Sequence, residues 1–407
     1  MEKGNKLTHM RAKKFSLLLA SLLIALLTIS AISVDTLRSH VTWLSDPARQ
    51  GRHGGTAGAA AAAEYLAEKF KEIGFDVQKQ EFGGNRRNVV AKGGTAERYI
   101  LIGAHYDGQG TDMPSASDNA AGVAVMLELA RDLKSKELPV SIVAVAFDDE
   151  EQGLNGSRYY SDHPLYPLDK AQAAIIFDTM GRTFMDLSTW TMFVLGTEYS
   201  SELAGVIQKR SAPEMLVVGT DLIGPRSDFA PFALKHIPYL FFTHATHKDY
   251  HEPGDTPDRV NYGKLAQDAS TIEQIVEDIA RLPEPPKFRD QPAYPASETA
   301  ALRRELDIVQ KERIDLPAAY SMMFEDFKSR LQNDDSREVR RVATSALLAL
   351  ATPRVSSFML VFILGPYYER EDQREVAAAI YEEAVKWTPD ASSRRELEEK
   401  IKTLRTR

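Results

Sequence analysis

The sequence predicts an α/β fold in which helices sandwich a mostly parallel central sheet, with a helical extension at the C-terminus. Four apolar runs of four to eight residues are rich in β-branched and aromatic side chains, which is typical of strands buried on both faces. A stretch with apolar residues at helical spacing separates the first two runs, and this strand–helix–strand order favours parallel pairing. The four runs are 99–104, 140–147, 174–177 and 237–242.

The N-terminus has the layout of a secretory signal peptide. An apolar run over 15–32 ends near small residues at Ala31 and Ser33, which offer a cleavage site. The same run can just span a bilayer, so an uncleaved membrane anchor is the alternative. We therefore expect an exported protein, periplasmic or secreted, which is anchored in the membrane if residues 1–33 are retained. Five cations precede the run: Lys3, Lys6, Arg11, Lys13 and Lys14.

The remaining segments up to residue 282 predict one large α/β domain over 34–282. Residues 34–55 are polar and carry few periodic signals. An Ala-rich helix that stops at Gly74 precedes two short strand signals, and two further amphipathic helices flank the later strands. The predicted elements are helix 57–73, strands 76–81 and 88–91, and helices 120–136 and 262–281.

A proline-rich stretch over 283–297 is typical of a semi-rigid linker. Beyond it, residues 298–407 are rich in Ala, Glu, Arg and Leu, with helix-like patterns and no strand-like alternation. The sequence thus predicts a helical C-terminal extension. Its composition suits a partner-binding module, a lid, a docking surface or a stability element.

The composition excludes several kinds of chemistry. The 407 residues include no cysteine, so disulfides, thiolate nucleophiles and cysteine-held zinc are absent, and any metal must be bound by His, Asp and Glu. The net charge of −8 becomes −12 if residues 1–33, which carry five cations and one carboxylate, are lost. A negative surface without a basic stripe argues against nucleic-acid binding.

Polar residues with metal-binding side chains follow each of the four apolar runs. Because ligands bind at the carboxyl ends of the strands in open α/β sheets, these residues can converge although they are far apart in the chain. In order, the runs lead into His105 and Asp107, into Asp148, Asp149, Glu150 and Glu151, into Asp178, and into a loop with His244, His247 and His251.

These residue types fit a metal site. Clustered carboxylates repel one another, and their burial is costly unless cations compensate them. Zinc is satisfied by His nitrogen and carboxylate oxygen, and two metals about 3.5–4 Å apart can share a carboxylate. Asp118 is the natural bridge, although an Asp before a helix also suits an N-cap. Glu150 and Glu151 should point in opposite directions, one to a metal and one free to move protons. Asp107 can orient the imidazole of His105.

With these residues in place, the chain resembles the zinc aminopeptidase family with two co-catalytic zincs. That family includes the secreted bacterial leucyl aminopeptidases, and its zinc-exopeptidase (phosphorylase/hydrolase-like) fold is shared by glutamate carboxypeptidases, transferrin receptors and glutaminyl cyclases. The resemblance covers roughly residues 40–282. The matching blocks occur in the family's order: a weaker GRHGGTAG (51–58), then GAHYD (103–107), SDNAAG (117–122), FDDEEQGLNGS (147–157), FDTMG (177–181), RSDFAPF (226–232) and YHEPGDTPDRVNY (250–262).

The resemblance implies a role for each matching residue. Among the loop histidines it selects His251, because only this one is followed by the family's Asp-Thr pair. Glu150 is then the general base, and Asp107 orients His105. Arg226 is similar to a substrate-positioning arginine of some bacterial members, and Tyr250, beside His251, is placed to polarise the scissile carbonyl. The implied ligands are His105, Asp118 and Asp178 on one zinc, and Asp118, Glu151 and His251 on the other.

One departure from the family pattern concerns the residues before Glu150. Asp148 and Asp149 stand where the family usually has small or apolar residues. Extra negative charge at this point favours protonated Glu150, so we expect a higher pH optimum.

The implied function is hydrolysis of the N-terminal peptide bond of peptides with a free amine, by a bridging water that two Zn²⁺ and Glu150 activate. A glutaminyl cyclase with one working zinc is an alternative, as is a carboxypeptidase acting on C-terminal Glu. The latter needs several arginines around the substrate carboxylate, and only Arg226 is a candidate. A binding protein on the same fold would lack the zinc ligands, all of which are present here.

Overall fold

The computed structural model describes residues 32–313, 315–333, 336–352 and 357–406. The predicted signal segment, 1–33, thus falls almost wholly outside the described residues. None of the helices in the described part of the chain is both long and apolar enough to cross a bilayer.

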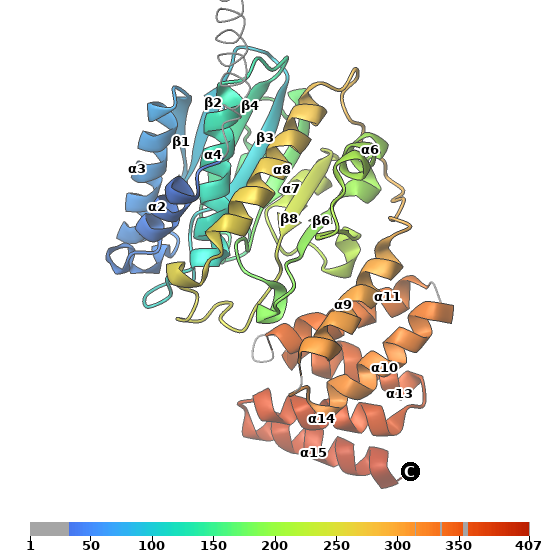
Figure 1. Cartoon of the computed structure of the whole chain (residues 1–407). Helices are drawn as coiled ribbons and strands as arrows, with labels where there is room; N and C mark the ends of the chain where they lie inside the picture. The colour runs from blue at the N-terminus through green and yellow to red at the C-terminus, as the bar shows by residue number, and fades with distance from the viewer. Residues whose placement is uncertain (1–31, 314, 334–335, 353–356, 407) are drawn as a thin grey trace, which may run out of the picture.

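Within the described residues, one mixed sheet of eight strands forms the centre of the molecule, in the order β1-β2-β4-β3-β5-β8-β6-β7 (Figure 1). Its central strands β4, β3, β5 and β8 are parallel, whereas β1–β2, β2–β4 and β6–β8 pair antiparallel. The predicted mostly parallel α/β architecture is confirmed. The strands are β1 Asp76–Gly83, β2 Arg86–Gly93, β3 Tyr99–His105, β4 Ser141–Phe147, β5 Ala171–Phe177, β6 Met192–Leu195, β7 Met215–Val217 and β8 Tyr239–Thr243.

Helices cover both faces of this sheet, because its central strands are apolar on both sides. Along β3, Ile100 and Ile102 belong to one apolar cluster, whereas Tyr99 and Leu101 belong to the other. The first cluster includes α2 Val34–Leu44, α3 Ala57–Glu72, α4 Ala121–Lys134, α6 Ser201–Arg210 and α8 Tyr262–Ala280. The second includes the short α7 Phe229–Leu234, and Tyr160 of α5 Asn155–Asp162 also belongs to it.

Several elements of this body were not foreseen, among them helices α2, α5, α6 and α7 and strands β6 and β7. Residues 34–55, expected to be irregular, begin with helix α2, whose Leu37, Val41 and Leu44 are fully buried. These apolar residues do recur at helical spacing, but polar residues between them hide the stripe. Strands β6 and β7 have only four and three residues, too few to produce a periodic pattern.

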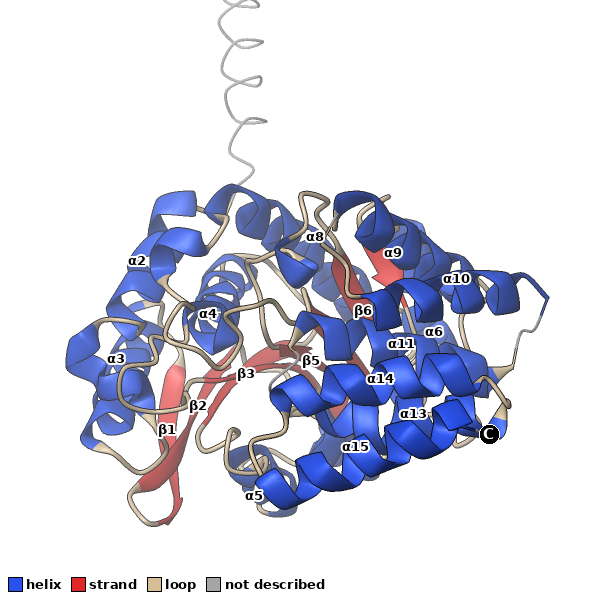
Figure 2. Cartoon of the chain, turned by 90° about the horizontal axis from the view of Figure 1, so that it is seen from below, coloured by secondary structure: helices blue, strands red, loops and turns tan. Residues whose placement is uncertain are grey.

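The C-terminal extension packs directly on the second face of the sheet (Figures 1 and 2). Leu302 and Leu347 of the extension share an apolar cluster with Leu195 of β6 and Phe241 of β8. The sheet face and these helices therefore form a continuous core. The helices are α9 Glu298–Glu312, α10 Ala318–Asn333, α11 Arg337–Ala351, α13 Gly365–Arg370, α14 Arg374–Trp387 and α15 Ala391–Thr406.

A buried arginine fixes the loop that follows β3. Arg52 is fully buried, and its guanidinium donates to the carbonyls of Tyr106 and Ser115, both at 2.9 Å, of Leu44 at 2.6 Å and of Pro114 at 2.9 Å. Burial lowers the pKa of Arg52 to about 10, so the guanidinium stays charged at neutral pH. This side chain therefore replaces water as the donor for a loop that leads to the functional residues.

Replacing Arg52 by Met should destabilise the fold, because it leaves four inward-facing carbonyls without their donor. Each buried polar group without a partner costs about 1–3 kcal/mol, so we expect the free energy of unfolding to fall by at least about 3 kcal/mol. Urea unfolding monitored by circular dichroism measures this difference. The matched control is Arg98→Met, since Arg98 is exposed. A loss below about 1 kcal/mol for Arg52→Met would contradict the assigned role.

A second prediction concerns pH. Glu305 of α9 is 1 % exposed and accepts a hydrogen bond from Thr191 Oγ1 at 3.2 Å. Burial raises its pKa from 4.5 to about 7. Between these two values the folded chain holds a proton that the unfolded chain has lost, so this group's contribution to stability falls as pH rises from 4.5 to 7.

We therefore expect Glu305→Gln to have little effect on stability at pH 4.5 and to gain stability relative to the parent protein by pH 8. At about 1.4 kcal/mol per pKa unit the gain is at most about 3 kcal/mol. Chemical denaturation of both proteins across this pH range measures it. An equal difference at both ends of the range would show that Glu305 does not titrate on folding.

Candidate metal centre and active site

The sequence-predicted metal ligands converge at the carboxyl ends of the parallel strands. His105 is the last residue of β3 and pairs in register with Phe147, the last residue of β4, so Glu150 and Glu151 follow at the same edge. Asp178 directly follows β5, and His251 lies in the loop after β8. Asp118 belongs to a short helical segment, Ala116–Ala120, in front of α4. Parallel pairing thus brings together residues that span almost 150 positions of the chain.

Asp118 lies between the two histidines. Its Oδ1 is 3.4 Å from His105 Nε2, and its Oδ2 is 3.0 Å from His251 Nε2. His105 Nε2 is also 3.3 Å from Asp178 Oδ1, and His251 Nε2 is 3.2 Å from Glu151 Oε2. The two carboxylate oxygens of Asp118 therefore lie beside different potential metal ligands. One oxygen is next to His105, which also contacts Asp178, and the other is next to His251, which also contacts Glu151.

These separations fit zinc. With Zn–N and Zn–O bonds of about 2.0–2.1 Å, two ligand atoms of a tetrahedral site lie about 3.3 Å apart, which matches the 3.0–3.4 Å found here. Moreover, the buried Oδ2 of Asp118 and Oε1 of Glu151 have no hydrogen-bond partner among the described residues. At least these two ligand oxygens thus remain available to a cation.

The buried carboxylates of the site are stabilised by positive charge nearby. Burial raises the pKa of Glu151 to about 7, with Asp118 adding to the shift. Burial alone would lower the pKa of His251, but Asp118 and Glu151 raise it to about 10. For Asp118, burial acts upward, yet His105 and His251 hold its pKa well below the ordinary value. The carboxylates are therefore stabilised by any cation placed among them.

Asp107 connects both strand ends. The Nδ1 of His105 lies 3.3 Å from the main-chain oxygen of Asp107 and 3.5 Å from its Oδ1. The same carboxylate accepts hydrogen bonds from the backbone N–H groups of Glu150 at 3.0 Å and Glu151 at 3.2 Å. Asp107 thus fixes the segment that carries the two glutamates and also lies against His105, the residue it was expected to orient.

Glu150 lies close to two of the candidate metal ligands, His105 and Asp178. One ligand atom from each of His105, Glu150 and Asp178 lies within 4.8 Å of the other two, as also holds for His105, Asp118 and Glu151. Either glutamate is thus within reach of a cation. Of the two glutamates, only Glu151 lies within the 4.0 Å limit of an ion pair with His251 in the described part of the chain, which favours Glu151 as the ligand.

The pKa of Glu150 is raised well above its ordinary value, as the sequence predicts, but for other reasons. Burial is the largest cause; His105 opposes it, and Asp178 and Asp228 add to it. Asp148 and Asp149, which the sequence analysis expected to raise this pKa, have partners of their own. Asp149 pairs with Arg86 Nε at 2.8 Å, and Asp148 accepts a hydrogen bond from the Arg87 N–H at 3.0 Å.

The two other loop histidines have structural partners. His244 Nε2 lies 3.0 Å from Asp268 Oδ2, and its Nδ1 accepts a hydrogen bond from the Gly181 N–H at 2.7 Å. His247 Nε2 lies 2.7 Å from Ser117 Oγ. Both side chains therefore hold the loop in place, in agreement with the choice of His251 as the candidate ligand.

A further His–Asp group near this loop is paired with arginines. Asp186, His247 and Asp249 offer ligand atoms within 4.8 Å of one another. Arg182 pairs with both of these aspartates, at 2.9 Å from Asp249, and Asp249 also lies 2.7 Å from Arg259 Nη1. This group is therefore an ion-pair cluster of the loop rather than a second cation site.

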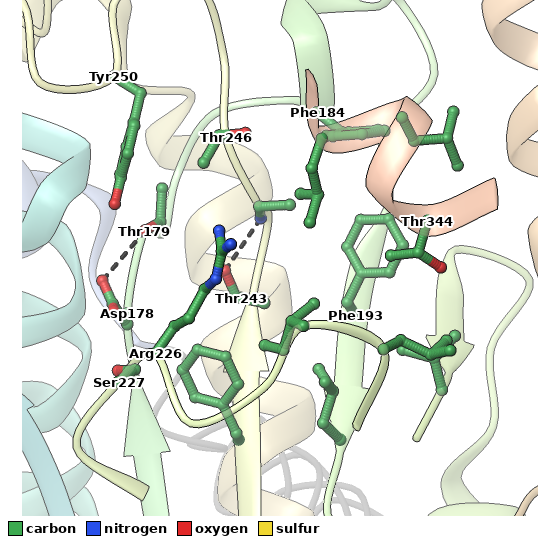
Figure 3. Close-up of a pocket in the computed structure, with 18 of the residues that line it drawn as sticks. Asp178, Thr179, Phe184, Phe193, Arg226, Ser227, Thr243, Thr246, Tyr250 and Thr344 are labelled. Atoms are coloured by element: carbon green, nitrogen blue, oxygen red, sulfur yellow. Dashed lines mark hydrogen bonds between the residues drawn. The ribbon is translucent and has the colours of Figure 1, made fainter. Parts of the chain in front are cut away.

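Arg226 and Tyr250, predicted to contact substrate, line one pocket that adjoins the metal ligands (Figure 3). The Tyr250 ring stacks on that of His251, with centroids 3.8 Å apart. Burial raises the pKa of Tyr250 well above its ordinary value, and Asp118 adds to the shift. The phenol therefore stays protonated and can donate a hydrogen bond. Arg226 is exposed at the pocket.

Two site residues lay inside quoted blocks but received no role from the sequence. Asp255 is 2 % exposed and accepts hydrogen bonds from the Ser117 N–H at 3.0 Å and the Asp118 N–H at 3.1 Å, so it positions the proposed bridge. Asp228 is fully buried, and burial raises its pKa to about 7. The only sequence signal for these residues is that Asp228 lies in the RSDFAPF block and Asp255 in the YHEPGDTPDRVNY block. Membership of a block does not show which groups the two carboxylates contact.

Comparison with known proteins places the fold and the family. Residues 88–276 match Peptidase family M28. The solved structure of BSAP, a zinc aminopeptidase from Bacillus subtilis, has a TM-score of 0.54 at 17% identity, over 60% of this chain and 94% of that one. A Porphyromonas gingivalis glutaminyl cyclase reaches a TM-score of 0.53 at 23% identity, over 61% and 99%. At these identities the structures establish the fold alone.

Sequence relatives are more informative about the family. Aminopeptidase YwaD of Bacillus subtilis is 28% identical over 199 residues, which cover 46% of this chain but only 42% of YwaD. The uncharacterized protein YfbL of Escherichia coli K12 is 31% identical over 258 residues, which cover 51% of this chain and 76% of YfbL. From the profile match and this long alignment, the chain belongs to peptidase family M28.

Proposed function

We propose that this zinc metallopeptidase is an aminopeptidase that binds two zinc ions and releases the N-terminal residue of peptides with a free amine. The observation that carries the proposal is the position of Asp118, whose two oxygens face His105 at 3.4 Å and His251 at 3.0 Å. A carboxylate so placed suits a bridge between two metals. The aminopeptidase YwaD is the relative whose activity we transfer.

When bound, the zinc ions lower the pKa of water and polarise the scissile carbonyl. Glu150 accepts a proton from the attacking water as its oxygen bonds to the carbonyl carbon. Glu150 then donates this proton to the departing amide nitrogen while the C–N bond breaks, which yields a free amino acid and a shortened peptide. Its raised pKa makes the Glu150 carboxylate a stronger base than an ordinary glutamate, which suits a group that takes up a proton and returns it.

Two residues of the adjoining pocket assist this reaction in our proposal. The protonated phenol of Tyr250 donates a hydrogen bond to the carbonyl oxygen as negative charge develops there. Arg226 positions the substrate at the exposed edge of the pocket. We also propose that the protein acts after export, in the periplasm or outside the cell, and that residues 15–32 anchor it in the membrane if they are not removed.

Glu150→Gln should abolish turnover, with a loss of at least about 10²-fold in kcat, yet leave the zinc content unchanged. Elemental analysis of the purified variant and release of leucine from a chromogenic amide measure the two quantities. Glu97→Gln is the matched control, because the Glu97 side chain is 78% exposed. Loss of zinc from Glu150→Gln would instead identify Glu150 as a ligand and exchange the roles of the two glutamates.

Asp118→Asn should bind less than one zinc per chain, because the substitution removes the charge of the proposed bridge; the parent protein should bind close to two. Metal analysis after dialysis, with the melting temperature as a check on folding, tests this. One zinc in the parent protein together with cyclisation of N-terminal glutamine would favour a cyclase. Release of C-terminal Glu would favour a carboxypeptidase, and no metal at all would favour a binding protein.

A further inference from the structure

An apolar pocket opens beside the metal ligands (Figure 3). Asp178, Tyr250 and His251 line the side next to the proposed zinc site. The pocket encloses about 190 Å³. A cavity of about 150 Å³ lined by Leu, Ile and Phe accepts benzene, so this pocket has room for a side chain the size of Leu or Phe. Its position beside the reacting groups makes it the natural site for a substrate side chain.

The far wall of this pocket comes from the C-terminal extension. Leu302 on α9 and Thr344, Leu347 and Leu348 on α11 line it, together with Phe193 and Leu195 of β6 and Phe241 of β8. Figure 3 includes Thr344 on the helix that forms this wall. All these extension residues lie outside the segment that matches the family, 88–276. The pocket is thus built from two parts of the chain that the sequence separates by a proline-rich stretch.

Buried polar contacts fix this wall to the peptidase body. Glu298, at the start of α9, is fully buried and accepts hydrogen bonds from the Gly219 N–H at 2.5 Å and from Arg340 Nη1 at 2.9 Å. Arg337 of α11 bridges Glu298 and Asp221. Buried charge pairs of this kind are costly to break, so α9 and α11 keep a defined position relative to the pocket.

We propose that the C-terminal extension is part of the substrate-binding site, with α9 and α11 completing the pocket for the side chain of the N-terminal residue and selecting a large apolar one, such as Leu or Phe. The proposal rests on the aminopeptidase function proposed above. Apolar contacts carry the selection, because each CH₂ group that a substrate buries in the pocket strengthens its binding. A single missing methylene in such a pocket lowers kcat/KM by about 10–200-fold.

The test compares Leu, Phe, Ala, Lys and Glu p-nitroanilides with the zinc-loaded full chain. We expect kcat/KM for Leu to exceed that for Ala by at least about tenfold. Thr344→Phe fills the pocket and should lower the ratio of kcat/KM for Leu to that for Ala by at least about tenfold. Leu347→Ala enlarges the pocket and should raise kcat/KM for Phe relative to Leu.

Met322→Phe is the matched control, since Met322 lies on α10 of the extension, is 37% exposed and does not line the pocket. Its ratio of Leu to Ala hydrolysis should equal that of the parent protein. Melting temperatures establish that each variant is folded, and Leu347→Ala supplies the test if Thr344→Phe is not.

Binding of free L-leucine and L-alanine, measured by calorimetry, separates this inference from the proposed function. If no amide is hydrolysed, the aminopeptidase function fails, and weaker L-leucine binding in Thr344→Phe but not in Met322→Phe still supports the pocket. A parent protein that prefers Ala, Lys or Glu overturns the inference and leaves the function intact. So does an unchanged Leu-to-Ala ratio in both pocket variants.

Discussion

The concentration of buried carboxylates at one edge of the sheet is the constraint on which the surrounding structure depends. Unpaired, such groups would be too costly to bury. The protein compensates them in different ways: Arg86 pairs with Asp149, backbone N–H groups bond to Asp107, and Ser117 bonds to Asp255. The carboxylate of Asp118 instead faces two histidines. In the proposed metal site a bound cation would compensate the charge of Asp118, so that stability and catalysis would share one electrostatic requirement.

The sequence was sufficient for the part of the fold that carries this edge. Strands β3, β4, β5 and β8 are apolar at nearly every position because both faces are covered, and such runs are conspicuous. From these runs the sequence predicts that the residues after the strands meet at one edge of the sheet. In the structure, the parallel register brings them within ion-pair distance. Helix α2 was missed because its apolar stripe is narrow, and β6 and β7 because three or four residues carry no period.

What the sequence could not provide are the contacts between distant loops. Nothing local to Arg52 indicates that its guanidinium will meet four carbonyls from two other segments. Likewise, the raised pKa of Glu150 was expected from its neighbours in sequence, whereas burial, Asp178 and Asp228 cause it. A proline-rich stretch also conceals that the helices after it share a core with the sheet. Such outcomes depend on tertiary packing, which periodicity does not encode.

The division of the pocket between two stretches of chain has an evolutionary consequence. The proposed metal ligands and general base lie between His105 and His251, whereas one wall of the adjoining pocket is formed by residues after position 297. Mutations in α9 and α11 can therefore alter the shape of that wall without touching the reacting groups. Substrate preference and reaction chemistry can thus change as nearly independent traits, because different stretches of the chain encode them.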